Sequence, residues 1–202
     1  MNKGILLVLS GYLMWGCFPL YWALLNHVNP SEVLIHRMLW AVPVLFFLVH
    51  FKSSWKNNFK DSISSKKELV FLFITAILIT INWGGYIYAV NLGRVVEASM
   101  GYFLSPVINM IGGYIFFQER ISKLKQLAVF LATVGALYYV FSGDSFPWLG
   151  FLVGFTFSAY GIARKAMASS AVPGLYIETL ILLPFLLIFS LWFYTNYDIA
   201  FF

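Results

Sequence analysis

Charged and polar side chains inside apolar stretches are the residues of this 202-residue chain whose types could bind a ligand or carry a proton. Glu32, His36 and Arg37 lie together in one such stretch. In a helix, Glu32 and His36 share a face, and Arg37 points roughly 140° away from Glu32. A bilayer core offers no water, so such groups must face protein or a wet cavity. The group is therefore a candidate part of a substrate or ion pathway.

Each of these side chains also has a structural interpretation. Glu32 is equally explained as a first-turn residue that complements the helix dipole, with Ser31 as the cap. His36 could titrate near neutral pH or be a hydrogen-bonded structural histidine. Arg37 lies about two turns inside the helix, which favours contact with a substrate or an ion pair over snorkelling to the headgroups.

A second group of polar residues lies between Asn82 and Arg120, which reads as two spanning helices joined by a short polar turn. Glu97, Gly101 and Ser105 recur at i, i+4 and i+8, so they share one helix face. The small and polar character of this face predicts that the hairpin forms the wall of a pathway.

Structural alternatives apply here as well. Glu97 could pair with Arg94, three residues earlier, at the membrane interface. Trp83 is the best tryptophan candidate for lining a pathway, although packing is the commoner role. Hydrogen bonds between helices, worth about 1 kcal/mol each, are the preferred interpretation of three polar side chains: Asn82, Ser105 and Asn109.

The composition identifies the elements that must position these residues. Hydrophobic residues make up 61% of the chain and charged residues only 10%, whereas soluble domains contain about 25% charged residues. The chain is therefore predicted to be an all-α polytopic membrane protein. The single cysteine, Cys17, is expected to be a packing residue and excludes an internal disulfide. The three histidines show no metal-ligand spacing, so neither a metal nor a cofactor is expected.

Seven segments are apolar and long enough to cross a bilayer, which takes about 20 residues. They cover residues 4–25, 33–51, 69–90, 98–117, 124–141, 145–163 and 174–194.

The distribution of basic residues predicts the orientation. Residues 52–67 carry five lysines and one aspartate, which places this connection in the cytoplasm. Alternating sides from there puts eleven of the thirteen Lys and Arg residues inside, with the N-terminus cytoplasmic. The net charge of +5 is then a consequence of topology and does not indicate nucleic acid as a partner.

A weak internal repeat divides the chain. Pro30 and Pro173 each precede a predicted helix and lie 143 residues apart. Five helices fit in this period, and an odd number inverts the second copy, as in many secondary transporters. Residues 1–143 are predicted to form a first five-helix repeat, and 144–202 the first two helices of a second, which lacks about three. Glu178 falls opposite Ile35, next to His36, and so is the predicted counterpart of that site.

Several motifs resemble the RarD branch of the EamA transporters, in the drug/metabolite transporter superfamily. They are EVLIHRMLW at 32–40, NWGGYIYAVN at 82–91, EASMGYFLSPVINMIGG at 97–113, QER at 118–120 and ETLILLP at 178–184. The resemblance implies a bacterial inner-membrane permease of ten helices in two inverted repeats, with cytoplasmic termini, that exports or exchanges small metabolites. Carried over by motif, the positions of interest are Glu32, His36, Arg37, Asn82, Trp83, Asn91, Glu97, Tyr102, Ser105, Asn109 and Glu178.

The predicted function is secondary-active transport of small metabolites or drug-like molecules by alternating access. In this hypothesis Arg37 attracts an anionic group, and Glu97 or Glu32 exchanges a proton or pairs with a cationic group. The alternatives are a non-transporting membrane assembly protein and a membrane-embedded enzyme; the latter is disfavoured because the chain lacks a nucleophile elbow and a zinc motif. The expected partners are the lipid bilayer and a small-molecule substrate, with a proton or a counter-substrate as the candidate coupled species, and homo-oligomerisation stays open.

Overall fold

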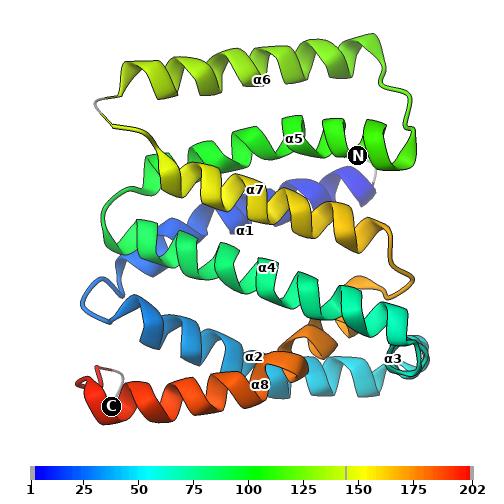
Figure 1. Cartoon of the computed structure of the whole chain (residues 1–202), viewed down its shortest axis with the longest axis vertical. Helices are drawn as coiled ribbons and strands as arrows, with labels where there is room; N and C mark the ends of the chain where they lie inside the picture. Colours follow the sequence, from blue (N-terminus) through cyan, green and yellow to red (C-terminus); the bar gives the residue numbers. More distant parts are fainter. Residues whose placement is uncertain (1–2, 144, 201–202) are drawn as a thin grey trace.

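The computed structural model describes residues 3–143 and 145–200, and eight helices form within them. They are α1 (Lys3–Ala23), α2 (Pro30–Phe51), α3 (Ser53–Ser64), α4 (Lys66–Asn91), α5 (Val95–Phe117), α6 (Lys123–Ser142), α7 (Trp148–Lys165) and α8 (Ala171–Asn196). The long helices lie side by side, with α7 between α5 and α4, and with α2 and α8 at the edge opposite α6 (Figure 1). No strand occurs in the described ranges.

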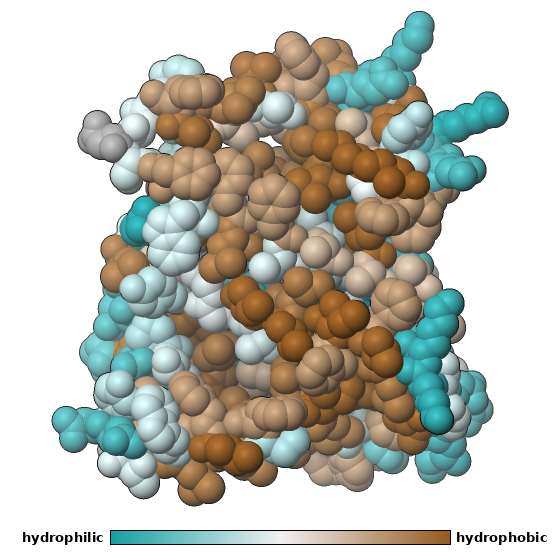
Figure 2. Space-filling view, viewed as in Figure 1, coloured by the Kyte–Doolittle hydropathy of each residue, from teal (hydrophilic) through white to brown (hydrophobic). Residues whose placement is uncertain are grey.

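Six of these helices are long and apolar enough to span a bilayer: α1, α2, α4, α5, α6 and α8. Hydrophobic side chains cover most of the face in Figure 2, and hydrophilic ones gather toward the ends of the helices. The chain is therefore a polytopic α-helical membrane protein. The sixth predicted span corresponds to α7, which has 18 residues and ends in Arg164 and Lys165. It is not among the six candidates, so the count of seven spans stays a prediction.

The basic connection between the second and third predicted spans is a helix, α3, which the sequence analysis missed. Its apolar residues Trp55, Phe59 and Ile63 recur every four positions and so share a face. Phe59 packs against Tyr176 of α8 with ring centroids 5.4 Å apart. This short amphipathic helix was overlooked because its low hydropathy excludes it as a span.

Close packing of α5 against α7 forms the centre of the bundle. Gly150 and Gly154 of α7 meet Gly101 of α5, and a Cβ atom on Gly154 would stand only 2.6 Å from the Gly101 carbonyl oxygen. This is the close approach that a Gly-x-x-x-Gly pattern permits in membranes. The two helices run in the same direction. Glu97 in the first turn of α5 contacts Leu149 at the start of α7, and Glu119, just beyond the end of α5, pairs with Lys165 at the end of α7.

Candidate functional site

An aromatic cavity of about 400 Å³ lies among α1, α4, α5 and α7. Its walls include the rings of Trp15, Tyr102 and Phe157, each pair with centroids 5.5 Å apart, and Tyr86, 5.9 Å from Tyr102. Ser99, Ser105 and Asn109 are among the polar residues that line it. Apolar walls with a few polar groups are typical of small-molecule sites, which measure about 300–1,000 Å³.

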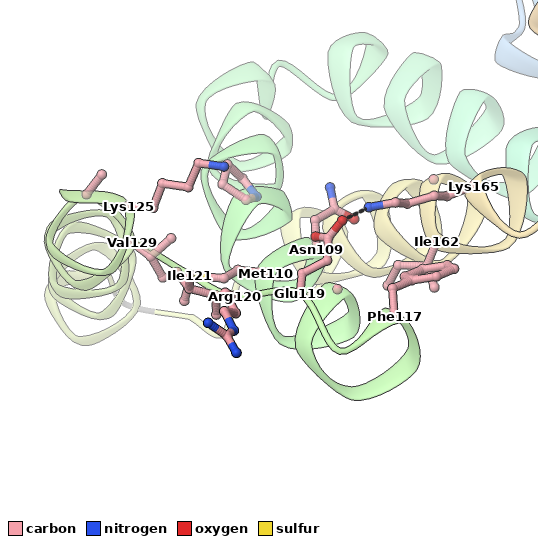
Figure 3. A pocket seen from close by; sticks show the side chains of 14 residues that line it. Asn109, Met110, Phe117, Glu119, Arg120, Ile121, Lys125, Val129, Ile162 and Lys165 are labelled. Atoms are coloured by element: carbon pink, nitrogen blue, oxygen red, sulfur yellow. Dashed lines mark hydrogen bonds and ion pairs between the residues drawn. The ribbon is translucent and has the colours of Figure 1, made fainter. Parts of the chain in front are cut away.

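A basic cavity of about 500 Å³ adjoins the aromatic cavity along α5. Pro106 and Asn109 line both, so the two spaces meet at these residues. Four charged side chains stand in its wall: Glu119, Arg120, Lys125 and Lys165. Glu119 reaches across to form an ion pair with Lys165, beside Asn109 (Figure 3). Residues of α5 from Ser99 to Phe117, at the end of the helix, line the two cavities.

The predicted polar stripe of α5 packs against α7, and its role as a pathway wall stays a prediction. Glu97, Gly101 and Ser105 do share a buried face, as predicted, and that face contacts α7. Small residues permit the closest helix approach, so the tightest neighbour occupies this side. The adjacent face, which carries Tyr102 and Asn109, lines the cavities; among the stripe residues, Ser105 does so as well.

Glu97 joins the two helices at the start of this seam. Its carboxylate pairs with Arg94 at 2.6 Å and accepts the backbone N–H of Leu149 at 2.8 Å. The first-turn amides of a helix have no partner within the helix, and a carboxylate there also complements the dipole. Both contacts fit the structural interpretation, and a pathway role for Glu97 stays a prediction.

Asn82 and Ser105 donate hydrogen bonds to α7. The Asn82 side chain donates to the Val153 carbonyl at 2.8 Å and to the Thr156 hydroxyl at 3.2 Å. The Ser105 hydroxyl lies 3.4 Å from the Gly154 carbonyl, in addition to a bond within its own helix. Asn109 differs, because it is exposed in the two cavities.

Arg37 is held between two tryptophan rings of neighbouring helices. Its guanidinium lies 4.0 Å from the Trp83 ring centroid and 5.5 Å from that of Trp22. It borders an outer cavity of about 420 Å³ that is also lined by Tyr21, Trp22, Leu25, Val33, His36 and Trp40. The arginine therefore packs on aromatic faces of the protein, in contrast to a snorkelling side chain.

The other polar residues of α2 have partners near the end of the described chain. Both oxygens of Glu32 accept the backbone N–H of Ala200, at 3.3 and 3.2 Å. His36 Nε2 hydrogen-bonds to the Tyr194 hydroxyl at 3.1 Å. The predicted Ser31 cap is wrong: the side chain of Asn29 caps α2 by accepting the Ser31 N–H at 2.9 Å. Pro30 is the first helical residue, which leaves Asn29 at the capping position.

Glu178 belongs to a separate buried polar cluster, away from His36. Its carboxylate accepts hydrogen bonds from Thr75 at 2.6 Å and Tyr160 at 3.3 Å, and Arg164 lies 3.7 Å away. Thr75, Tyr160 and Arg164 were not predicted as site residues, because no local pattern links residues as far apart as Thr75 and Glu178. Cys17 is also a correction, since it is exposed on α1 and not packed.

The connection between α7 and α8 is fastened to α3 and α4. Glu68 accepts the backbone N–H groups of Ala168 and Ser169 at 3.0 and 3.3 Å. The Asn58 side chain accepts the N–H of Ser170 at 2.8 Å. These contacts hold the basic helix α3 at the same end of the bundle as the end of α7.

Comparison with known proteins identifies the family. Residues 2–141 match the EamA-like transporter family. Protein RarD of Escherichia coli (strain K12) is 37% identical over 183 residues, which cover 91% of this chain and 62% of that protein. The uncharacterized transporter YojE of Bacillus subtilis (strain 168) is 35% identical over 185 residues, with the same coverage of 91% and 62%. The chloramphenicol-sensitive protein RarD of Pseudomonas aeruginosa is 30% identical over 194 residues, 95% of this chain and 65% of that protein.

The chain thus spans less than two thirds of the length of these relatives. No solved structure matches it significantly. The family match, the sequence identities and the apolar helices agree with one another, and the chain belongs to the EamA-like transporter family, in its RarD-type branch.

Proposed function

We propose that the protein is a secondary-active transporter of small metabolites or drug-like molecules in the bacterial inner membrane. The observation that carries this proposal is the pair of cavities that meet at Pro106 and Asn109. The polar amide of Asn109 is exposed within α5, between the aromatic cavity and the basic cavity, and such a position is typical of a solute path.

The proposed topology has seven spans in the described chain, with α7 as the sixth, and a cytoplasmic N-terminus. Two observations support it. The first is that α7 runs alongside α5 in the same direction. The second is that the connection from the basic end of α7 to α8 is hydrogen-bonded to α3 and α4. The basic segments therefore gather at one end of the bundle, as the positive-inside rule requires.

The proposed mechanism is alternating access between two inverted repeats, one formed by residues 1–143 and the other beginning at 144. The family match over residues 2–141 supports this division. The path would open and close at the ends of α5 and α7, where the Glu119–Lys165 ion pair spans the charged mouth. An exposed ion pair contributes only about 0–1 kcal/mol, so it can break without a large barrier. Glu32 and Glu97 are the candidates for coupling to a proton.

Untargeted efflux from proteoliposomes tests the proposal. Vesicles that contain the purified protein are loaded with a bacterial metabolite extract, and mass spectrometry identifies the solutes that leave faster than from protein-free vesicles. Asn109→Trp fills the junction of the two cavities and should abolish this efflux. Ile111→Trp, on the exposed side of the same helix, is the matched control and should retain it. Efflux equal to that of empty vesicles would favour a non-transporting assembly protein.

A further inference from the structure

Two residues that line the outer cavity between α1 and α2, Trp22 and Arg37, carry hydrogen-bond donors without an acceptor among the described residues. Among the described residues no carboxylate forms an ion pair with Arg37, and no hydrogen bond to its guanidinium is present. Trp22 Nε1, in the wall of the same cavity, is the one buried side-chain nitrogen or oxygen of the described ranges without a partner. An unmade hydrogen bond of a buried donor costs about 1–3 kcal/mol, so this arrangement favours an acceptor brought by a ligand.

The position of Arg37 suits it to bind a carboxylate. Its guanidinium carbon lies 4.0 Å from the Trp83 ring centroid, so the cation packs on an aromatic face, which does not use its N–H groups. A guanidinium edge matches the two oxygens of a carboxylate and forms paired, charge-assisted hydrogen bonds. The carboxylate of Glu32, the nearest acidic residue in the sequence, already accepts the Ala200 N–H with both oxygens.

The rest of the outer cavity is mainly apolar. Leu25, Val33, Tyr21 and Trp40 form its walls, and its volume of about 420 Å³ accommodates a ring-sized molecule. We propose that the outer cavity binds a small organic anion with one carboxylate and an apolar, ring-sized body. Arg37 and Trp22 Nε1 donate hydrogen bonds to the carboxylate, and the aromatic walls surround the body. The inference rests on the proposed transport function, for which it supplies the substrate class.

Ligand-induced thermal stabilisation of the full-length protein in detergent tests the inference without transport. Benzoate is the probe, and benzamide, its neutral isostere, is the control ligand. Benzoate should raise the Tm with a saturable dose dependence, and benzamide should not. Arg37→Gln should abolish the shift, and Arg37→Lys should weaken it because the paired geometry is lost. This comparison of two ligands on the wild-type protein needs no variant to fold.

The tryptophan donor has its own matched pair of variants. Trp22→Phe removes the N–H group and should weaken the apparent affinity for benzoate about tenfold, the value of one charge-assisted hydrogen bond. Trp192→Phe makes the same change on α8, at a residue that is 51% exposed and does not line the cavity, and should leave the affinity unchanged.

Four results would overturn the inference. One is equal stabilisation by benzoate and benzamide, and another is a benzoate shift that survives in Arg37→Gln. The third is Arg37-dependent stabilisation by phosphatidylglycerol and none by benzoate, which would make the cavity a lipid headgroup site. If the efflux assay detects transport while benzoate fails to bind, the inference fails and the transport function stands.

Discussion

Replacement of Gly154 by alanine should separate α5 from α7. The added Cβ atom would lie 2.6 Å from the Gly101 carbonyl oxygen and 3.2 Å from Gly101 Cα, whereas ordinary contacts are 3.4–4 Å. Both obstacles are backbone atoms, so only a shift of one helix by about 1 Å relieves the overlap. Overpacking of this kind costs about 1–3 kcal/mol. At about 2–4 °C per kcal/mol for a chain of this size, the Tm should fall by about 2–12 °C.

The control is Gly161→Ala on the same helix. Its Cβ atom would meet only Asn109 Oδ1, at 3.7 Å, which is an ordinary contact. Glycine inside a helix is destabilising by about 0.5–1 kcal/mol relative to alanine, so this variant should be as stable as wild type or slightly more. The assay is the thermal loss of monodisperse protein, measured by fluorescence-detected size exclusion. If Gly154→Ala has the same Tm as Gly161→Ala, then α5 and α7 do not pack as closely as the structure indicates.

Three further predictions follow from the contacts between helices and from the proposed topology. Asn82→Ala should lower stability by about 1 kcal/mol, seen as a small fall in Tm, because it removes the donor to α7. Arg164→Gln should cost about 3 kcal/mol, since it leaves the Glu178 carboxylate buried without a cation; a Tm within one degree of wild type would refute this. A Lys56→Cys variant in a Cys17→Ser background should react with an impermeant maleimide only after the cells are permeabilised, and labelling of intact cells would reverse the topology.

Hydropathy and residue type predicted much of this protein. The predicted spans that became α1, α2, α4, α5, α6 and α8 are apolar enough to cross a bilayer, and Arg37 was identified because a charge within a span is costly. The contact that holds Arg37 was not predicted in detail, although Trp83 was selected as a candidate for lining. Local sequence signals indicate that a side chain is unusual, and the three-dimensional packing decides what it contacts.

The stripe on α5 shows why the remainder could not be predicted. Helical periodicity gives the residues that share a face, but it does not say which neighbour that face meets. Glu97, Gly101 and Ser105 were assigned to a pathway wall, and they face α7 because small residues pack closest. The cluster around Glu178 depends on Thr75, 103 residues earlier, so only tertiary structure reveals it.

Accessibility of residue 109 tests the central claim, a solute path along α5, most directly. Cys17 is the only cysteine, so Asn109→Cys in a Cys17→Ser background offers a single reactive thiol. A membrane-impermeant thiosulfonate is applied to right-side-out and to inverted vesicles, and the labelled fraction is measured by mass spectrometry. Alternating access predicts labelling from both sides of the membrane. A thiol that reacts from neither side, or from one side alone under every condition, would contradict the account.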